Sequence, residues 1–298
     1  MESVLTLVAA PGREGLEAQA CERGAAALAA AGASLGPADW LAPAEAWEQA
    51  FSGPPVSRAR EILQAALAEL PLDVAVTPLA GRRKKLLVAD MESTIIAEEM
   101  LDEIAARLGI ADRIAPITAR AMAGELDFTA ALRERVALLA GQPANLLEEM
   151  ATGMTLNPGA RTLIRTLRAA GAVTALVSGG FTCFTEGVAT ACGFDRQQAN
   201  RLVIEDGRLT GEVAAPVLDR GAKQRALEAL AAEQGLDPAE TCAVGDGAND
   251  LDLLRAAGLG VGYRPKAALR AVADAAIDHG DLTALLYFQG YRRAEFKS

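Results

Sequence analysis

The stretch Leu86-Leu87-Val88-Ala89-Asp90-Met91-Glu92-Ser93-Thr94 joins an uninterrupted apolar run to a cluster of two carboxylates and two hydroxyls. A short apolar run of this kind is typical of a strand that is buried on both faces of a parallel sheet. Such sheets bind ligands at the carboxyl ends of their strands. Two carboxylates at a buried strand end are also costly without a cation or hydrogen-bond donors. The stretch therefore predicts an α/β fold with a functional site that begins at residue 90.

The same pattern recurs along the chain. Apolar runs at 173–177, 241–244 and 259–261 alternate with helical segments, which predicts a Rossmann-like parallel sheet covered by helices. Ser178-Gly179-Gly180 follows the first of these runs, and a hydroxyl with consecutive backbone amides at a helix start suits an anion. Gly245-Asp246-Gly247-Ala248-Asn249-Asp250 follows the second, and a cluster so rich in glycine and acids is hard to explain by packing.

Together these clusters predict a site for phosphoryl transfer. A carboxylate nucleophile needs a metal that holds it in line and neutralises the phosphate, and Mg²⁺ prefers oxygen ligands. Asp90 and Asp246 offer two such ligands from neighbouring strand ends. Lys223, early in a helix, can neutralise nucleophile and phosphate, while Ser178 and the glycine amides hold the remaining oxygens. Taken singly, Asp90 could be a helix cap, the glycine turn an ordinary turn, and Lys223 a surface charge.

The chain is expected to form three units. Residues 84–95 and 158–298 would build the α/β core, which includes a hairpin with Asp206-Gly207 at its turn. Residues 96–157 have helical stretches but no strand character, and they are too long for a simple crossover, so they predict a helical cap. Residues 1–80 have a strand–helix–strand–helix–strand rhythm, which predicts a small α+β domain before a basic linker.

Composition excludes several classes of protein. Of 298 residues 51% are hydrophobic and 23% charged, which rules out wholesale disorder. The net charge of −10 argues against a nucleic-acid partner, which needs a positive surface. A single histidine, His279, excludes histidine-nucleophile phosphatases and zinc sites built on several histidines. Four cysteines without ligand spacing indicate a reducing compartment, and no signal peptide or membrane span is evident, so a cytoplasmic protein with a small-molecule substrate is expected.

The ordered motif set has a recognisable likeness. Asp90-x-Glu92-x-Thr94, Ser178-Gly179-Gly180, Lys223 and the 245–250 cluster resemble the haloacid dehalogenase (HAD) superfamily of aspartyl-phosphate phosphatases. Within it, Glu99, the stretch 121–128 and Arg135 are similar to the phosphoserine phosphatases, and the resemblance covers roughly residues 84–280. It implies the HAD fold and Mg²⁺-dependent hydrolysis of O-phosphoserine to L-serine and phosphate through an aspartyl-phosphate, a step of serine biosynthesis.

The resemblance also implies a role for each matching residue at the reacting centre. Asp90 would be the nucleophile and a magnesium ligand. Glu92 would give its backbone carbonyl to the metal and act as the general acid and base. Asp246 would be the third protein ligand, and Asp250 would support the metal shell.

The remaining roles concern the substrate. Glu99 and Arg135 would hold the amino and carboxylate groups of serine. Met122 and Phe128 would line the cap, or else pack as helix core residues. The residues implied to contact the phosphate or lie beside the substrate are Ser178, Gly179, Lys223 and Asn249.

Glu92 departs from the family pattern, which has Asp at this position. The longer side chain moves the proton-carrying carboxyl, and a misplacement near 1 Å can cost on the order of 100-fold in rate. Two alternatives to an active phosphoserine phosphatase follow: an enzyme for another small phosphate ester, or an inactive amino-acid sensor. The N-terminal domain is similar to small regulatory amino-acid-binding (ACT-like) domains, and it is equally a candidate dimerisation module for a homodimer.

Overall fold

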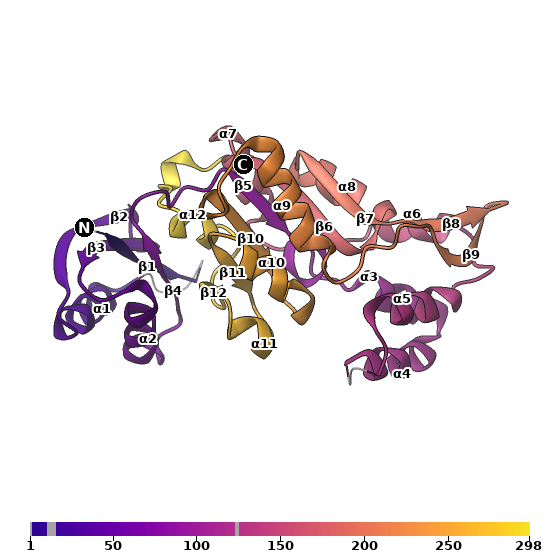
Figure 1. Cartoon of the computed structure of the whole chain (residues 1–298), viewed down its shortest axis with the longest axis horizontal. Coiled ribbons are helices and arrows are strands. Elements are labelled where there is room, and N and C mark those ends of the chain that lie inside the picture. Colours follow the sequence, from indigo (N-terminus) through magenta and orange to yellow (C-terminus); the bar gives the residue numbers. More distant parts are fainter. Residues whose placement is uncertain (1, 11–15, 123–124) are drawn as a thin grey trace.

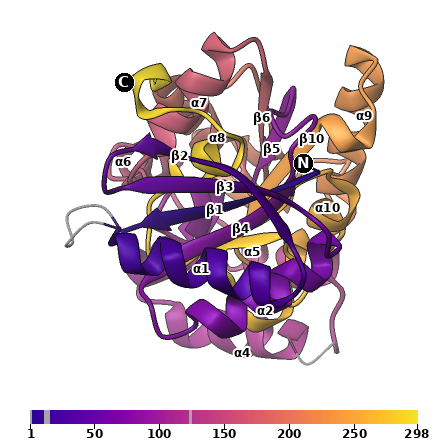
Figure 2. The same ribbon diagram turned by 90° about the vertical axis from the view of Figure 1, so that its left-hand side faces the viewer.

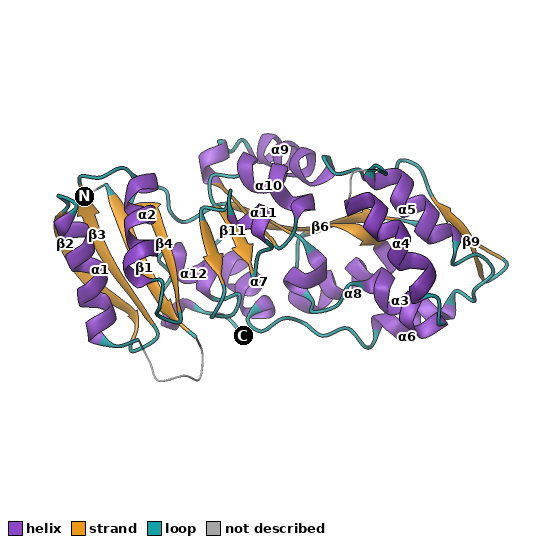
Figure 3. Cartoon of the chain, turned by 90° about the horizontal axis from the view of Figure 1, so that it is seen from below, coloured by secondary structure: helices purple, strands orange, loops and turns teal. Residues whose placement is uncertain are grey.

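The computed structural model describes residues 2–10, 16–122 and 125–298, and in it the chain forms three parts along one long axis (Figure 1). A four-stranded sheet with two helices occupies the N-terminal end, and a six-stranded sheet with flanking helices occupies the middle. Further helices and a two-stranded hairpin occupy the other end. Figure 3 shows the same order from below, with helices on both sides of the middle sheet.

The middle part is a parallel sheet, as the sequence predicts, and its strands β7 and β12 come in addition to the four predicted runs. Its strand order is β12-β11-β10-β5-β6-β7, and every neighbouring pair is parallel. The apolar run of residues 86–89 is β5, which is completely buried between β10 and β6. The six strands are β5 (Leu86–Ala89), β6 (Val173–Phe181), β7 (Arg196–Asn200), β10 (Thr241–Gly245), β11 (Gly260–Tyr263) and β12 (Ala275–Ile277).

Helices cover both faces of this sheet. Leu86 and Val88 pack in a cluster with apolar residues of α9 and α10, whereas Leu87 and Ala89 belong to the cluster on the opposite face with α7, α8 and α12. This alternation explains why β5 carries apolar residues at every position. The helices of the middle part are α7 (Ala160–Ala169), α8 (Thr182–Cys192), α9 (Ala222–Gln234), α10 (Leu251–Ala256), α11 (Ala267–Arg270) and α12 (Ala284–Phe288).

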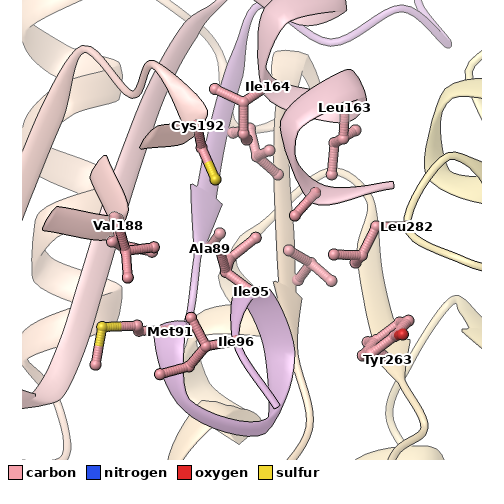
Figure 4. Packing of buried hydrophobic residues seen from close by; sticks show 14 of the residues in the cluster. Ala89, Met91, Ile95, Ile96, Leu163, Ile164, Val188, Cys192, Tyr263 and Leu282 are labelled. Carbon is pink, nitrogen blue, oxygen red and sulfur yellow. The ribbon is translucent and has the colours of Figure 1, made fainter. Parts of the chain in front are cut away.

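The turn after β5 is held in place by apolar packing against neighbouring helices. Figure 4 shows this packing around the end of the strand, where side chains of the turn meet side chains of α7 and α8. The turn covers residues 91–95, directly after Asp90, and its backbone at Ser93 has a positive φ of 53°. The labelled residues are Ala89, Met91, Ile95, Ile96, Leu163, Ile164, Val188, Cys192, Tyr263 and Leu282.

The cap leaves and rejoins the core at adjacent points. Ile96 and Leu156 form an isolated antiparallel bridge, and the side-chain amide of Asn157 donates to the carbonyls of Thr94 and Ile96 at 2.8 and 2.9 Å. The hairpin of β8 (Leu202–Glu205) and β9 (Arg208–Val213) turns at Asp206-Gly207 as expected and packs its β9 strand on α5. The cap helices are α3 (Met100–Leu108), α4 (Ala111–Met122), α5 (Phe128–Ala137) and α6 (Asn145–Ala151).

The N-terminal part is a four-stranded antiparallel sheet of order β2-β3-β1-β4. Figure 2, in which this end faces the viewer, shows α1 and α2 lying along the strands. The sequence predicts only three strands here, and β3 is the additional one, because its Ala, Glu and Gln residues favour a helix until β1 and β2 pair with it. The elements are β1 (Ser3–Ala9), α1 (Ala18–Ala30), β2 (Ser34–Ala42), β3 (Ala46–Ser52), α2 (Val56–Leu67) and β4 (Leu72–Pro78).

A buried carboxylate joins the N-terminal part to the core. Asp73 on β4 is 1% exposed and accepts hydrogen bonds from the backbone N–H groups of Asp278, His279 and Gly280 at 2.8, 2.9 and 2.7 Å. A Cβ on Gly280 would lie 2.6 Å from Asp73 Oδ2, so this approach requires glycine. His279 itself is exposed, as the sequence suggests, and contributes through its backbone. Among the described residues, no helix is long and apolar enough to cross a membrane.

Candidate active site

The candidate site lies at the carboxyl ends of three neighbouring strands. Asp90 follows β5, Asp246 follows β10, and the turn of Ser178, Gly179 and Gly180 lies within the last residues of β6. Because β5 is hydrogen-bonded to both other strands, the parallel arrangement brings these three clusters to one edge of the sheet. The motifs that are far apart in the sequence therefore meet, as the sequence predicts.

Lys223 links two buried carboxylates. Its ammonium Nζ lies 2.7 Å from Asp90 Oδ1 and 2.5 Å from Asp250 Oδ1, and all three side chains are almost completely buried. Burial disfavours the charged ammonium, but Asp250 and Asp90 outweigh it and raise the pKa of Lys223. Burial and the charge of Asp250 raise the pKa of Asp90, against the opposing effect of Lys223. Lys223 is thus a buried cation rather than a surface charge.

Three carboxylates are close enough to share a cation. One oxygen each of Asp90, Asp246 and Asp250 lie within 4.8 Å of one another, and all three residues are buried. Buried carboxylates that crowd together repel unless a cation or donors compensate, and an all-oxygen donor set suits a hard divalent ion. The residues present therefore fit a centre for a divalent metal ion.

Asp250 also holds the backbone of its own turn. Its Oδ2 accepts from the N–H groups of Asp246 and Gly247 at 3.2 and 3.3 Å. A Cβ on Gly245 would lie 2.4 Å from this oxygen, so the close approach needs glycine there. Asn249 donates from Nδ2 to Asp90 Oδ2 at 3.3 Å. The 245–250 cluster therefore fixes Asp246 and Asn249 around Asp90, which explains its unusual composition.

The glycine turn of β6 faces the cap. Ser178 Oγ accepts the N–H of Gly180 at 2.9 Å, which leaves the hydroxyl hydrogen free to be donated. Phe128 at the start of α5 covers Gly179, since a Cβ at 179 would lie 2.9 Å from the Phe128 ring. Phe128 thus lines the cap face of the site as predicted, whereas the side chain of Met122 lies outside the part of the chain that the structure describes.

Glu92 is directed toward the same turn. Its Oε1 accepts the N–H of Met100 at 2.8 Å, and a Cβ on Gly180 would lie 3.0 Å from its Oε2. Burial, together with the neighbouring charge of Glu99, raises the pKa of Glu92 to about 7. A carboxyl with a pKa near neutrality can both donate and accept a proton at physiological pH. The longer side chain at this position therefore still reaches the site, with its carboxyl beside the glycine turn.

One cavity of about 270 Å³ gathers these residues with the charged residues of the cap. Glu99 lies at its wall and accepts from the Ser93 hydroxyl at 2.7 Å. Burial lowers the pKa of the Arg135 guanidinium, which the carboxylates of Asp102 and Glu92 oppose. The predicted site residues that line the cavity are Asp90, Glu92, Glu99, Arg135, Gly179, Asp246 and Asn249.

A small cavity of about 20 Å³ shares Phe128, Gly179 and Asn249 with the first one, and it is lined by the glycine turn and the segment before α9. Ser178, Gly179, Lys223 and Asn249 are among its lining residues, so donors surround it from several elements. Asp250 lies behind Lys223 and lines neither cavity. A third, larger cavity of about 800 Å³ lies against α1 in the N-terminal part, but none of the motif residues lines it.

Sequence reasoning missed two residues of this region. Lys266 follows β11, lines the larger of the two site cavities, and places Nζ 2.9 Å from Asp246 Oδ2. It lies three residues after the end of β11 and five after the predicted apolar run 259–261, and this place after a strand is a signal that the sequence carries. Asn200 at the end of β7 holds the carbonyl of Gly179, and nothing in its polar strand marks it.

The comparisons with known proteins agree with this geometry. The sequence profile of haloacid dehalogenase-like hydrolases matches residues 87–255, more than half of the chain. The phosphoserine phosphatase of Streptomyces coelicolor is 44% identical over 86% of this chain, which spans 63% of that protein's length. The phosphoserine phosphatase of Lactococcus lactis is 42% identical over 69% of this chain and 95% of its own length.

The fold is also found among solved structures. A HAD-family hydrolase from Salmonella enterica serovar Typhi superposes with a TM-score of 0.84 at 27% identity, over 97% of this chain and 99% of its own. That match includes the N-terminal sheet as well as the core and cap, because so little of either chain is left out. The profile match, the relatives and the shared architecture together establish that the chain belongs to the haloacid dehalogenase-like hydrolase family.

Proposed function

We propose that this protein is a Mg²⁺-dependent phosphoserine phosphatase, which hydrolyses O-phosphoserine to L-serine and phosphate. The observation that carries the proposal is that one cavity is lined both by Asp90 and by the charged pair Glu99 and Arg135. Phosphoserine carries an ammonium group and a carboxylate, which Glu99 and Arg135 match by opposite charge. Its phosphate ester would meet Asp90 as nucleophile and the cation of Lys223 beside it. The names of the similar phosphatases support the same substrate.

The first step is attack on phosphorus by a carboxylate oxygen of Asp90. The new Asp90–phosphorus bond forms as the bond from phosphorus to the serine oxygen breaks, which gives an aspartyl-phosphate. The protonated Glu92 donates its proton to the departing serine oxygen, and a pKa of about 7 makes this form available. Lys223, beside Asp90, balances the charge that gathers on the phosphate oxygens.

The second step is hydrolysis of the aspartyl-phosphate. The Glu92 carboxylate left by the first step takes a proton from a water whose oxygen attacks phosphorus. The Asp90–phosphorus bond breaks, Asp90 returns as a carboxylate, and Glu92 is again protonated. One carboxyl therefore serves both steps, and its location beside the glycine turn is suited to both.

A magnesium ion would be held by the carboxylates of Asp90 and Asp246 and by the backbone carbonyl of Glu92, with Asp250 in support. When bound, it would neutralise the phosphate and hold the nucleophile in line. Ser178 and the amide of Gly179 would hold phosphate oxygens, and Asn249 would lie beside the substrate.

The cap would recognise the amino-acid end of the substrate. Arg135 would pair with the serine carboxylate, because a guanidinium matches a carboxylate through two parallel hydrogen bonds. Glu99 would hold the ammonium group from the same cavity. This arrangement predicts preference for phosphoserine over phosphate esters that lack either charge.

Release of inorganic phosphate from phosphoserine, with Mg²⁺ and with EDTA, tests the proposal. We expect turnover that requires Mg²⁺, and at least a tenfold lower kcat/KM for phosphoethanolamine, which lacks the carboxylate. The Asp90→Asn variant is the matched control for contaminating phosphatase. Equal rates on both esters would favour a phosphatase of another small phosphate ester. Serine binding without turnover at any Mg²⁺ concentration would favour an inactive amino-acid sensor.

Two further features stay predictions. A place in serine biosynthesis in the cytoplasm follows from the proposed activity. A homodimer through the N-terminal part would be tested by light scattering of the full chain.

A further inference from the structure

The end of β6 departs from regular pairing at the glycine turn. Val177 pairs with Gln198, but the next pair is Phe181 with Asn200, so three residues of β6 lie opposite one residue of β7. A bulge of this kind locally disrupts the ladder and turns the extra residues out of it. Here the extra residues are those of the glycine turn, and their backbone groups need partners outside the regular ladder.

The side chain of Asn200 supplies one of these partners. Its Nδ2 donates to the carbonyl of Gly179 at 2.8 Å, and its Oδ1 accepts the N–H of Leu218 at 2.8 Å. The residue is only 1% exposed. One buried amide therefore joins the glycine turn to the segment that leads into α9, which carries Lys223.

Both segments are walls of the small cavity of about 20 Å³. Gly179 and Leu218 both line it, together with Ser178 and Lys223, whereas Asn200 does not. The amide thus connects the two walls without itself lining the cavity. A residue that binds both walls determines the distance between the donors of the glycine turn and the ammonium group of Lys223.

We propose that Asn200 is a positioning residue for phosphate binding, which fixes the distance between the glycine turn and the Lys223 segment. The inference rests on the proposed function, because it takes the small cavity as the phosphate subsite. Removal of the amide leaves the carbonyl of Gly179 and the N–H of Leu218, both part-buried, without this partner, and the two walls lose their shared anchor. Since a 1 Å misplacement can cost on the order of 100-fold in rate, a small shift of either wall is enough to be measured.

The test compares Asn200→Ala with Gln289→Ala in the full chain. Gln289 is a matched control, because it too is a buried amide that accepts one backbone N–H, from Lys84, and donates to one carbonyl, of Leu285. Calorimetric titration with inorganic phosphate and Mg²⁺ measures the subsite directly, and phosphoserine kinetics measures kcat and KM. Hydrogen exchange by mass spectrometry follows the segments 178–181 and 216–220.

Asn200→Ala is expected to weaken phosphate binding at least tenfold, lower kcat/KM by about 100-fold and speed exchange in both segments. Gln289→Ala should show a decrease in Tm similar to that of Asn200→Ala, but it should keep the phosphate affinity of the parent. If the alanine variant does not fold, Asn200→Asp takes its place. Aspartate keeps the acceptor for the N–H of Leu218 but loses the donor to the carbonyl of Gly179, so hydrogen exchange should become faster in 178–181 alone.

Unchanged phosphate affinity in Asn200→Ala, or an equal loss in Gln289→Ala, would overturn the inference. A parent that binds phosphate but does not hydrolyse phosphoserine would contradict the proposed substrate and leave the phosphate comparison valid. A parent that hydrolyses phosphoserine but binds no phosphate would overturn the inference and leave the proposed function in place.

Discussion

The ring of Phe128 in the cap lies over Gly179 in the core so closely that a Cβ at position 179 would stand 2.9 Å from its Cζ. Carbon atoms in van der Waals contact are about 3.5–4.0 Å apart. The cap therefore lies against the glycine turn at a place where the core residue has no side chain. The position of the cap and the identity of residue 179 depend on each other.

Gly179→Ala should push the Phe128 ring away and lower kcat/KM for phosphoserine about 10- to 100-fold, in line with the cost of a displacement near 1 Å. In a Phe128→Ala background, the same substitution should cost less than half as much in log(kcat/KM), because the ring that it meets is gone. Steady-state kinetics of the four proteins of this cycle measures the coupling. Additive effects would mean that the alanine acts on the phosphate itself and not on the cap.

Asp90→Asn should lower phosphate release by at least about 1,000-fold, since loss of the nucleophile in a serine protease costs about 10⁶-fold in kcat. The amide keeps the size of the side chain, so circular dichroism should show an intact fold. Turnover within tenfold of the parent would place the nucleophile elsewhere, with Asp246 and Asp250 as the nearest candidates.

The pKa of Glu92, raised to about 7 by burial and by Glu99, predicts a pH profile. The first step needs the protonated carboxyl, so kcat/KM should fall tenfold per pH unit above about 7 and level off below it. Glu92→Gln cannot exchange a proton, so its profile should be flat there and its rate lower by about 10²–10⁴-fold.

Glu92→Asp is the control for this profile, and it should keep or raise activity while the fall with pH remains. A Glu92→Gln variant as fast as the parent would show that another group moves the proton. An inactive Glu92→Asp would instead mean that the cavity is shaped for the longer side chain.

Arg135→Ala should raise KM for phosphoserine about 10- to 100-fold, the equivalent of losing a hydrogen bond between charged groups. KM for phosphoethanolamine should change little, because that ester has no carboxylate. Arg135→Lys should recover only part of the loss, since an ammonium cannot form two parallel bonds with a carboxylate. Equal losses on both esters would make Arg135 a residue of the fold rather than of substrate recognition.

Asp73→Ala should lower the free energy of unfolding by about 1–3 kcal/mol, because three backbone N–H groups lose their acceptor. Asp39→Ala is the control, since Asp39 joins the same two parts of the chain through an exposed pair with Arg292, and its loss should lower the free energy of unfolding less than the loss of Asp73 does. Urea unfolding of both variants measures the difference. Equal losses would show that the buried carboxylate adds nothing beyond an exposed ion pair.

The strands that lie inside the central sheet could be predicted from sequence, because a strand buried on both faces must be apolar throughout. β7 could not, since its sequence Arg-Gln-Gln-Ala-Asn has no apolar run, and it becomes a strand only because β6 offers an edge to pair with. The same holds for β3, whose partners decide its conformation.

The candidate site divides in the same way. Charged residues at the end of an apolar strand, such as Asp90 and Asp246, can be identified from sequence, because burial of a charge is costly unless the charge has a function or a partner. Asn200 does not, because an amide is common in loops and its role depends on two backbone groups that only the folded chain brings to it. Lys266 is an intermediate case. The sequence shows that it follows a strand, but only the folded chain shows that its ammonium pairs with the carboxylate of Asp246.

The chain leaves the core for the cap and returns to it at adjacent points, which the bridge of Ile96 and Leu156 joins. This has a consequence for the evolution of such a protein. An insertion whose ends adjoin costs its host little more than loop closure, and each doubling of its length adds only about 0.6 kcal/mol. Lengthening or exchange of the segment would leave the order of the strands, and hence Asp90 and Asp246, untouched. Under the proposed function, selection for what is bound acts on Arg135 and its neighbours, while selection for how the ester is cleaved acts on the sheet. The two properties can then evolve at different rates within one polypeptide.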